Sequence, residues 1–181
     1  GFRGGLILCC MRGKENQNAN EETLRTASAF LGDGVCAVDL AGAEALYPTS
    51  GYDILFNHAR KLSLPFNIHA GEADGPESVR DALRFGEKRV GHGVRSIEDP
   101  ELCRYLVKHQ IPLEVCYTSN LQTKAVGTEI HPIRKLFDMG VHVTVNTDNR
   151  TVSNTTMMQE RKLLQEVFGF TEKELDIMEN Y

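Results

Sequence analysis

Short apolar runs alternate with longer helical patterns along the whole chain, and this alternation is the strongest constraint on how it can fold. The apolar runs predict strands at 5–10, 35–40, 65–69, 89–91, 111–116 and 141–146. The longer patterns predict helices at 21–31, 52–62, 76–85, 99–109, 132–139 and 156–167, and a capping box at Thr171 and Glu174 opens a last helix. Strict alternation of strand and helix predicts a parallel sheet covered by helices.

The number of strand–helix units limits the architecture further. A closed (β/α)8 barrel needs eight units and about 250 residues, whereas this chain has 181 residues and six units. No glycine-rich phosphate-binding motif follows any of the runs, so a dinucleotide-binding or P-loop fold has no support. We therefore expect an α/β fold, an incomplete TIM (β/α)8 barrel of about six units, as a single partial barrel domain over residues 1–181.

Composition excludes several classes of function. The chain carries 20 Lys and Arg against 25 Asp and Glu, a formal net charge of −5. This mild acidity argues against binding to a nucleic-acid backbone, and no apolar run approaches the ~20 residues of a membrane span. No signal peptide is visible, and five cysteines without a CxxC pair indicate buried, reduced thiols. These features predict a cytoplasmic protein.

Reactive side chains gather where the predicted strands end. His69 and Glu72 close the third strand, and His92 stands between two glycines at the end of the fourth. The segment 118–120 (TSN) follows the fifth strand, and Asp148 follows the sixth. In α/β barrels the carboxyl ends of the strands form the face where active sites lie. We expect these side chains to share one cavity.

The residue types suggest metal-assisted hydrolysis. His69 and Asp148 are suitable zinc ligands, Glu72 can move protons beside a metal, and His92 can orient or deprotonate a metal-bound water. Each motif alone also has a structural explanation, such as a tight turn around His92 or a helix cap after Asn146. Their joint position on one face favours the hydrolytic site.

The four remaining histidines are weaker candidates for such a site. His58 and His109 are expected on helix surfaces. His131 is expected at a helix start, and His142 within the last strand.

Seven segments resemble the adenosine deaminase family, and they occur in the family's order and spacing. They are 8–12, 39–42, 69–72, 89–93, 113–116, 118–120 and 146–148. The resemblance covers the chain from about residue 6 to residue 167. It implies a zinc-dependent (β/α)8 barrel that hydrolyses the 6-amino group of adenosine, giving inosine and ammonia.

The resemblance also implies roles for individual residues. His69 and Asp148 would bind Zn²⁺, Glu72 would protonate purine N1, and His92 would hold and polarise the zinc-bound hydroxide. Zinc lowers the pKa of its bound water to about 7, so hydroxide is available at neutral pH.

Substrate contacts are implied at two further positions. The backbone at Gly42 would meet the N3 side of the purine. Asn149 stands where the family commonly has an aspartate that contacts N7, and its amide could donate a hydrogen bond there. Ala43 replaces a family aspartate. The expected ligand is a nucleoside, adenosine or 2′-deoxyadenosine.

One family feature is absent from the sequence. The chain contains no His-x-His pair, which in the family lies on the first strand and supplies two more zinc ligands. The resemblance implies that the first two units and the C-terminal end of the barrel lie outside this chain. We therefore expect the isolated chain to be inactive or nearly so. We also expect it to self-associate through open sheet edges and an apolar barrel interior.

Three interpretations remain open. The leading one is an adenosine aminohydrolase, with the chemistry belonging to the whole protein. The second is an adenine or other purine nucleoside deaminase of the same superfamily, although adenine deaminases would be expected to have Asp in place of Gly91. The third is a truncated, non-catalytic remnant that binds a nucleoside or a protein, which would need neither Glu72 nor His92.

Overall fold

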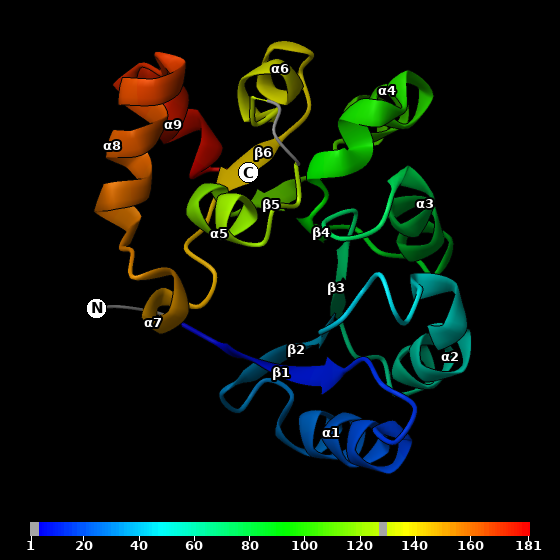
Figure 1. Cartoon of the computed structure of the whole chain (residues 1–181). Helices are drawn as coiled ribbons and strands as arrows, with labels where there is room; N and C mark the ends of the chain where they lie inside the picture. The colour runs from blue at the N-terminus through cyan, green and yellow to red at the C-terminus, as the bar shows by residue number, and fades with distance from the viewer. Residues whose placement is uncertain (1–3, 127–129) are drawn as a thin grey trace.

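The computed structural model describes residues 4–126 and 130–181. Within these ranges six parallel strands form one sheet, and their order along the sheet follows their order in the chain. The strands are Leu6–Met11 (β1), Val35–Ala41 (β2), Phe66–Ala70 (β3), Val90–His92 (β4), Leu113–Val115 (β5) and Val143–Val145 (β6). The sheet curves into an open barrel with helices around its outer side (Figure 1). The predicted α/β fold is confirmed.

Helices follow every strand. The longer α-helices are Gln17–Phe30 (α1), Asp53–Lys61 (α2), Pro76–Arg84 (α3), Pro100–His109 (α4), Met157–Phe168 (α8) and Glu172–Met178 (α9). Three shorter ones are Tyr117–Gln122 (α5), Ile133–Asp138 (α6) and Arg150–Ser153 (α7), and two 3₁₀-helices are Thr49–Tyr52 (η1) and Val94–Glu98 (η2). The helices α5 and α7 were not predicted, because each is too short to show a periodic apolar face. No helix in the described ranges is long and apolar enough to cross a membrane.

Helix α1 begins four residues earlier than the sequence pattern indicates. The buried Asn20 accepts a hydrogen bond from the backbone N–H of Met11 at 2.8 Å and donates one to its carbonyl at 3.0 Å. These two bonds tie the first turns of α1 to the end of β1. A polar, asparagine-rich segment that looks like a loop is therefore helical because of a tertiary contact.

The hydrophobic core lies between the sheet and the outer helices. Alternate strand residues face outward and are at most 1% exposed: Val38, Leu40, Ile68, Val90, Leu113 and Val143. Helix residues that are equally buried pack against them: Leu24, Phe56, Val79, Leu102, Leu136 and Leu164. Removing these apolar side chains from water is the main stabilising contribution to the fold.

The concave side of the sheet is polar over β3 to β6, so the expectation of an apolar barrel interior holds only for β1 and β2, where Ile7, Met11 and Ala37 share the face of Asp39. Glu114 of β5 accepts hydrogen bonds from Asn67 of β3 and from Arg89, which precedes β4. Arg89 also lies 3.4 Å from the hydroxyl oxygen of Thr144 in β6. The Asn67–Glu114 and Arg89–Thr144 contacts join strands that are not neighbours, which is geometrically feasible only on the concave side. Charged pairs therefore occupy positions that the apolar pattern of the strands did not reveal.

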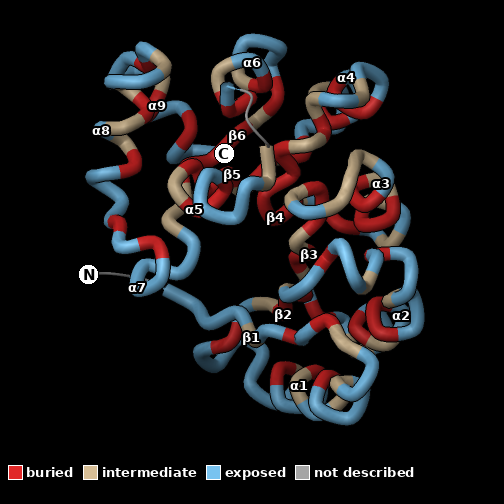
Figure 2. The backbone as a smooth tube through the Cα atoms, in the orientation of Figure 1, coloured by how far each residue is buried: buried red, intermediate tan, exposed pale blue. Residues whose placement is uncertain are grey.

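Strands β1 and β6 lie at the two ends of the sheet. Leu6 is 64% exposed and Ile7 is 49% exposed, and much of β1 is pale in Figure 2. Cys9 and Cys36 are also exposed, contrary to expectation, because β1 and β2 lie at this open end. Cys10, Cys103 and Cys116 are buried and all five thiols are free. Self-association through these edges stays a prediction.

Candidate active site

His69 lies near the C-terminal end of strand β3. Its Nδ1 lies 2.9 Å from Oδ2 of Asp39 on the neighbouring strand β2. Burial lowers the pKa of His69, but the hydrogen bond and the charge of Asp39 outweigh burial, and the net pKa lies above the ordinary value. Because Nδ1 donates to a carboxylate, Nε2 is the atom left for a ligand. This carboxylate–histidine pair is typical of histidines that bind metals.

The rings of His92 and His69 lie beside each other although the two residues are not paired in the sheet. Ala70, rather than His69, pairs with His92 in the sheet, so regular alternation would turn the His92 ring to the outer side. His92 instead has a left-handed backbone conformation with a φ of 59°, and its ring lies 4.8 Å from the His69 ring between centroids. Burial holds the pKa of His92 below its ordinary value, which favours the neutral ring.

Gly91 makes this approach of two histidines feasible. A Cβ at residue 91 would lie 3.1 Å from Cα and 3.2 Å from Nδ1 of His69, closer than most real contacts. The glycines around His92 therefore have a packing role as well as a turn role.

Glu72 faces His92 from the loop after β3. Its Oε2 lies 3.5 Å from Nε2 of His92. Its Oε1 accepts hydrogen bonds from Nδ2 of Asn120 at 2.9 Å and from the hydroxyl of Thr123 at 3.1 Å. Two donors on one oxygen fix the carboxyl group, and the other oxygen points to the histidine. Helix α5 supplies Asn120, so the TSN segment acts from a helix rather than from a loop.

The loop that carries Glu72 is held by a buried carboxylate that sequence reasoning missed. Glu44 is 3% exposed, and its two oxygens accept hydrogen bonds from four consecutive backbone N–H groups, those of residues 71–74, at 2.7–3.1 Å. The hydroxyl of Ser78 donates a further bond. The only sequence signal is an acidic residue shortly after the β2 strand end, which is also common in loops.

A second missed residue is Arg12, which follows β1. Its guanidinium group donates to the backbone carbonyls of Tyr47 and His69, each at 2.6 Å, and to the hydroxyl of Thr49 at 2.9 Å. Arg12 is 4% exposed. It thus ties the ends of β1 and β3 together below the His69 ring.

Asp148 follows β6 with a φ of 54°. Burial raises the pKa of Asp148, but a 2.6 Å hydrogen bond from the Ser119 hydroxyl and the nearby His92 outweigh burial, and the net pKa is lowered. The charge of Asp148 in turn raises the pKa of His69. The carboxylate is therefore ionised at neutral pH and electrostatically coupled to that histidine, as a metal ligand pair would require.

Gly42 and Asn149 lie at the same strand ends but hydrogen-bond to none of these four side chains in the described ranges. Gly42 closes β2 with a φ of 111° and is exposed, so its backbone is accessible. Asn149 caps helix α7, because its Oδ1 accepts from the N–H groups of Thr151 and Val152 at 3.1 Å. Its amide nitrogen is left for a ligand.

Two ligands do not make a complete zinc site. Between residues 4 and 126 and between 130 and 181, no group of three or more His, Cys, Asp and Glu side chains is arranged to hold a metal ion. Catalytic zinc sites use roughly three protein ligands plus water. His69 and Asp148 have suitable donor atoms, but the described residues do not suffice for tight zinc binding.

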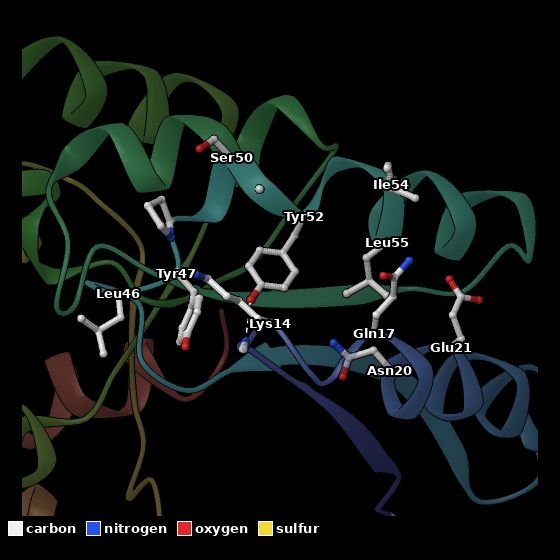
Figure 3. Close-up of a pocket in the computed structure, with 13 residues that line it drawn as sticks. Lys14, Gln17, Asn20, Glu21, Leu46, Tyr47, Ser50, Tyr52, Ile54 and Leu55 are labelled. Carbon is white, nitrogen blue, oxygen red and sulfur yellow. Dashed lines mark hydrogen bonds between the residues drawn. The ribbon is translucent and has the colours of Figure 1, made fainter.

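A separate groove of about 400 Å³ lies between the start of α1 and the segment 46–55 (Figure 3). Leu46, Tyr52 and Leu55 contribute much of its apolar lining, with Lys14 and Glu21 at its polar side. None of the six predicted site residues lines it. The groove is therefore distinct from the cluster at the strand ends.

Known proteins match this chain over nearly its whole length. A protein-family model described as adenosine deaminase matches residues 1–180. An adenosine deaminase from Haemophilus ducreyi is 48% identical over 171 residues, which is 92% of this chain and 50% of the relative. The chain thus spans about half the length of the curated relatives it matches.

Solved structures show the same arrangement. The adenine deaminase from Arthrobacter aurescens aligns with a TM-score of 0.87 and 27% identity over 96% of this chain and 53% of that one. An amidohydrolase from Burkhoderia ambifaria, solved with bound Zn, aligns with a TM-score of 0.87 and 23% identity over 96% and 49%. The second match, at this identity, shows the fold. Together with the family model and the shared sequence, these matches show that the chain belongs to the adenosine deaminase family.

Proposed function

We propose that this chain forms about half of an adenosine aminohydrolase, which converts adenosine and water to inosine and ammonia. The observation that carries the proposal is the grouping of Glu72, His92 and His69 at the ends of β3 and β4, with the Glu72 carboxyl fixed 3.5 Å from His92. A held carboxyl group beside a neutral imidazole suits proton transfer to a heteroaromatic base.

In the whole protein, His69 and Asp148 would supply two ligands to Zn²⁺, and the remaining ligands would come from outside this chain. When bound, the metal supplies an activated water at neutral pH. An amidohydrolase of the same fold was solved with bound Zn, which is consistent with a metal site in this fold.

Residues of this chain carry out the proton transfer, the positioning of the water and the binding of the purine. Glu72 delivers a proton to purine N1, which drains electron density from the ring and makes C6 electrophilic. His92, held neutral by burial, orients the attacking water beside C6. Addition of the water forms the C6–O bond, a proton from that water passes to the amino group, and the C6–N bond then breaks with loss of ammonia. Gly42 and Asn149 present backbone and amide groups to the N3 and N7 sides of the purine.

A second candidate, adenine deamination, is favoured by the fold match to the adenine deaminase from Arthrobacter aurescens. The higher identity of 48% to an adenosine deaminase supports the nucleoside as substrate. In both cases the reaction at C6 is the same, and the difference lies in whether a ribose is required.

The test is ammonia release by the zinc-loaded whole protein from adenosine, 2′-deoxyadenosine and adenine, measured side by side. We expect turnover of both nucleosides and little or none of adenine. Preference for adenine would select the second candidate, and no ammonia from any purine would contradict both.

A further inference from the structure

A hydrogen-bonded chain of two buried side chains leads from the start of helix α6 to Glu72 and His92. The backbone N–H of Ile133 donates to Nδ1 of His131 at 3.2 Å. Nε2 of His131 lies 3.3 Å from Oδ1 of Asn120. Nδ2 of Asn120 lies 2.9 Å from Oε1 of Glu72 and 3.1 Å from Nδ1 of His92. Asn120 and His131 are 0% and 3% exposed.

The direction in which these hydrogen bonds are donated is fixed at the Ile133 end of the path. A backbone N–H can only donate, so Nδ1 of His131 must be the acceptor. Burial lowers the pKa of His131 to about 4, and the ring is therefore neutral near pH 7. A neutral ring has one N–H, which must lie on Nε2 and point to Oδ1 of Asn120. The amide oxygen of Asn120 thus faces His131.

The contacts at the Glu72 end of the path independently give the same orientation of the Asn120 amide. Oε1 of Glu72 already accepts from Thr123, and a carboxylate oxygen needs a donor opposite it. The atom of Asn120 that faces Glu72 must therefore be the amide nitrogen. Its other hydrogen faces Nδ1 of His92, which must accept. An imidazole whose Nδ1 accepts a hydrogen bond carries its N–H on Nε2, which here is the atom 3.5 Å from Oε2 of Glu72.

We propose that Asn120, locked in orientation by His131, is a positioning residue that sets the tautomer of His92 and selects the proton-carrying oxygen of Glu72. His92 carries its hydrogen on Nε2. Oε1 of Glu72 is engaged by two donors, so the proton that moves to the substrate is carried on Oε2. The catalytic consequence rests on the proposed deamination, whereas the tautomers themselves are properties of this chain.

The first test needs no substrate. The chain is labelled with ¹⁵N at its six histidines, and long-range ¹H–¹⁵N correlation NMR at neutral pH reads the protonated nitrogen of each ring. Signals are assigned with His92→Gln and His131→Gln. We expect the Nε2–H form at both positions in the unmodified chain. An Nδ1–H form at His92 would overturn the proposal.

Substitution at Asn120 tests whether this residue sets the tautomer of His92. In Asn120→Asp the side chain can no longer donate to His92, so Nδ1 of His92 should become protonated. Thr123→Val is the matched control, since it removes a donor to Glu72 and Thr123 makes no hydrogen bond to His92 within the described residues, and it should leave the Nε2–H form. An unchanged His92 tautomer in a folded Asn120→Asp chain would count against the proposal.

A pair of variants at residue 131 covers the case in which Asn120→Asp does not fold. His131→Gln keeps an amide donor toward Asn120, whereas His131→Phe keeps the volume and removes the donor. We expect His92 to stay Nε2–H in the first variant and to show both tautomers in the second. A single unchanged tautomer in both would overturn the role of His131.

The kinetic test uses the whole protein. Asn120→Ala should lower kcat about 10–100-fold, as expected for misplaced general acid–base groups, and change KM by less than about threefold. If the whole protein fails to deaminate adenosine while the tautomers are as expected, the proposed function fails and the positioning role stands. If it deaminates adenosine with His92 in the Nδ1–H form, the reverse holds.

Discussion

The carboxylate of Glu44 accepts a hydrogen bond from the backbone N–H of Glu72 at 3.1 Å, and three neighbouring N–H groups donate to the same carboxylate. One buried acid thus fixes the main chain from which another acid reaches the candidate site. The two residues lie 28 positions apart in the sequence.

Glu44→Gln should therefore loosen the loop that carries Glu72. One carboxylate oxygen becomes an NH₂ group that faces backbone donors, so several charge-assisted hydrogen bonds are lost. We expect a fall of about 2–4 kcal/mol in the free energy of unfolding, measured by urea denaturation. Glu98→Gln, a surface control that pairs with Arg95, should change it by less than about 0.5 kcal/mol. Equal effects of the two variants would contradict the anchoring role.

Glu72→Ala should abolish deamination in the whole protein and leave zinc bound, because in the proposed mechanism Glu72 moves a proton and does not bind the metal. Turnover of adenosine and metal content by atomic absorption are measured on the same sample. Glu77→Ala, on the exposed start of α3, is the matched control and should retain activity. Full activity of Glu72→Ala would remove Glu72 from the mechanism.

His69→Ala should lose zinc from the whole protein, because the Nε2 donor is removed while Asp39 loses its partner. Metal content after dialysis should fall at least about tenfold relative to the unmodified protein. His109→Ala, at the exposed end of α4, serves as the control. Unchanged zinc in His69→Ala would contradict its ligand role.

Glu87→Gln should stabilise the chain at neutral and alkaline pH. Burial raises the pKa of Glu87 from 4.5 to about 9 in the folded chain. Its contribution to stability is complete below pH 4.5 and is lost as the pH rises toward 9, because the unfolded chain releases the proton first. A neutral glutamine removes this loss, so the variant should gain on the order of 1–3 kcal/mol at pH 8 relative to pH 5.

Urea denaturation at pH 5 and pH 8 measures this gain. Glu101→Gln, an exposed control on α4, should show no pH-dependent gain. A constant difference between Glu87→Gln and the unmodified chain at both pH values would contradict the buried, protonated state of Glu87.

The sequence was sufficient for the alternation of strands and helices and for the placement of His69, Glu72, His92 and Asp148 at strand ends. Apolar periodicity reports burial against the helices, which is why all six strands were located to within two residues. Periodicity does not report polar contacts between distant segments. The Glu114 contacts on the concave side were therefore missed.

The same limit applies within the candidate site. Glu44 and Arg12 act through hydrogen bonds to backbone groups some 25–60 residues away, and backbone partners leave no mark on side-chain patterns. The rotation of His92 toward His69 depends on one positive φ angle, which the flanking glycines suggested only as a turn.

Because sheet order follows chain order, each strand pairs only with the strands that precede and follow it. The sheet therefore behaves like a row of repeats in which cooperativity passes between nearest neighbours, and it can fray inward from either end. Strands β3 and β4 occupy the middle of the row and are the last to separate. The histidines His69 and His92 thus sit where backbone amide exchange with solvent should be slowest, while β1 and β6 open first.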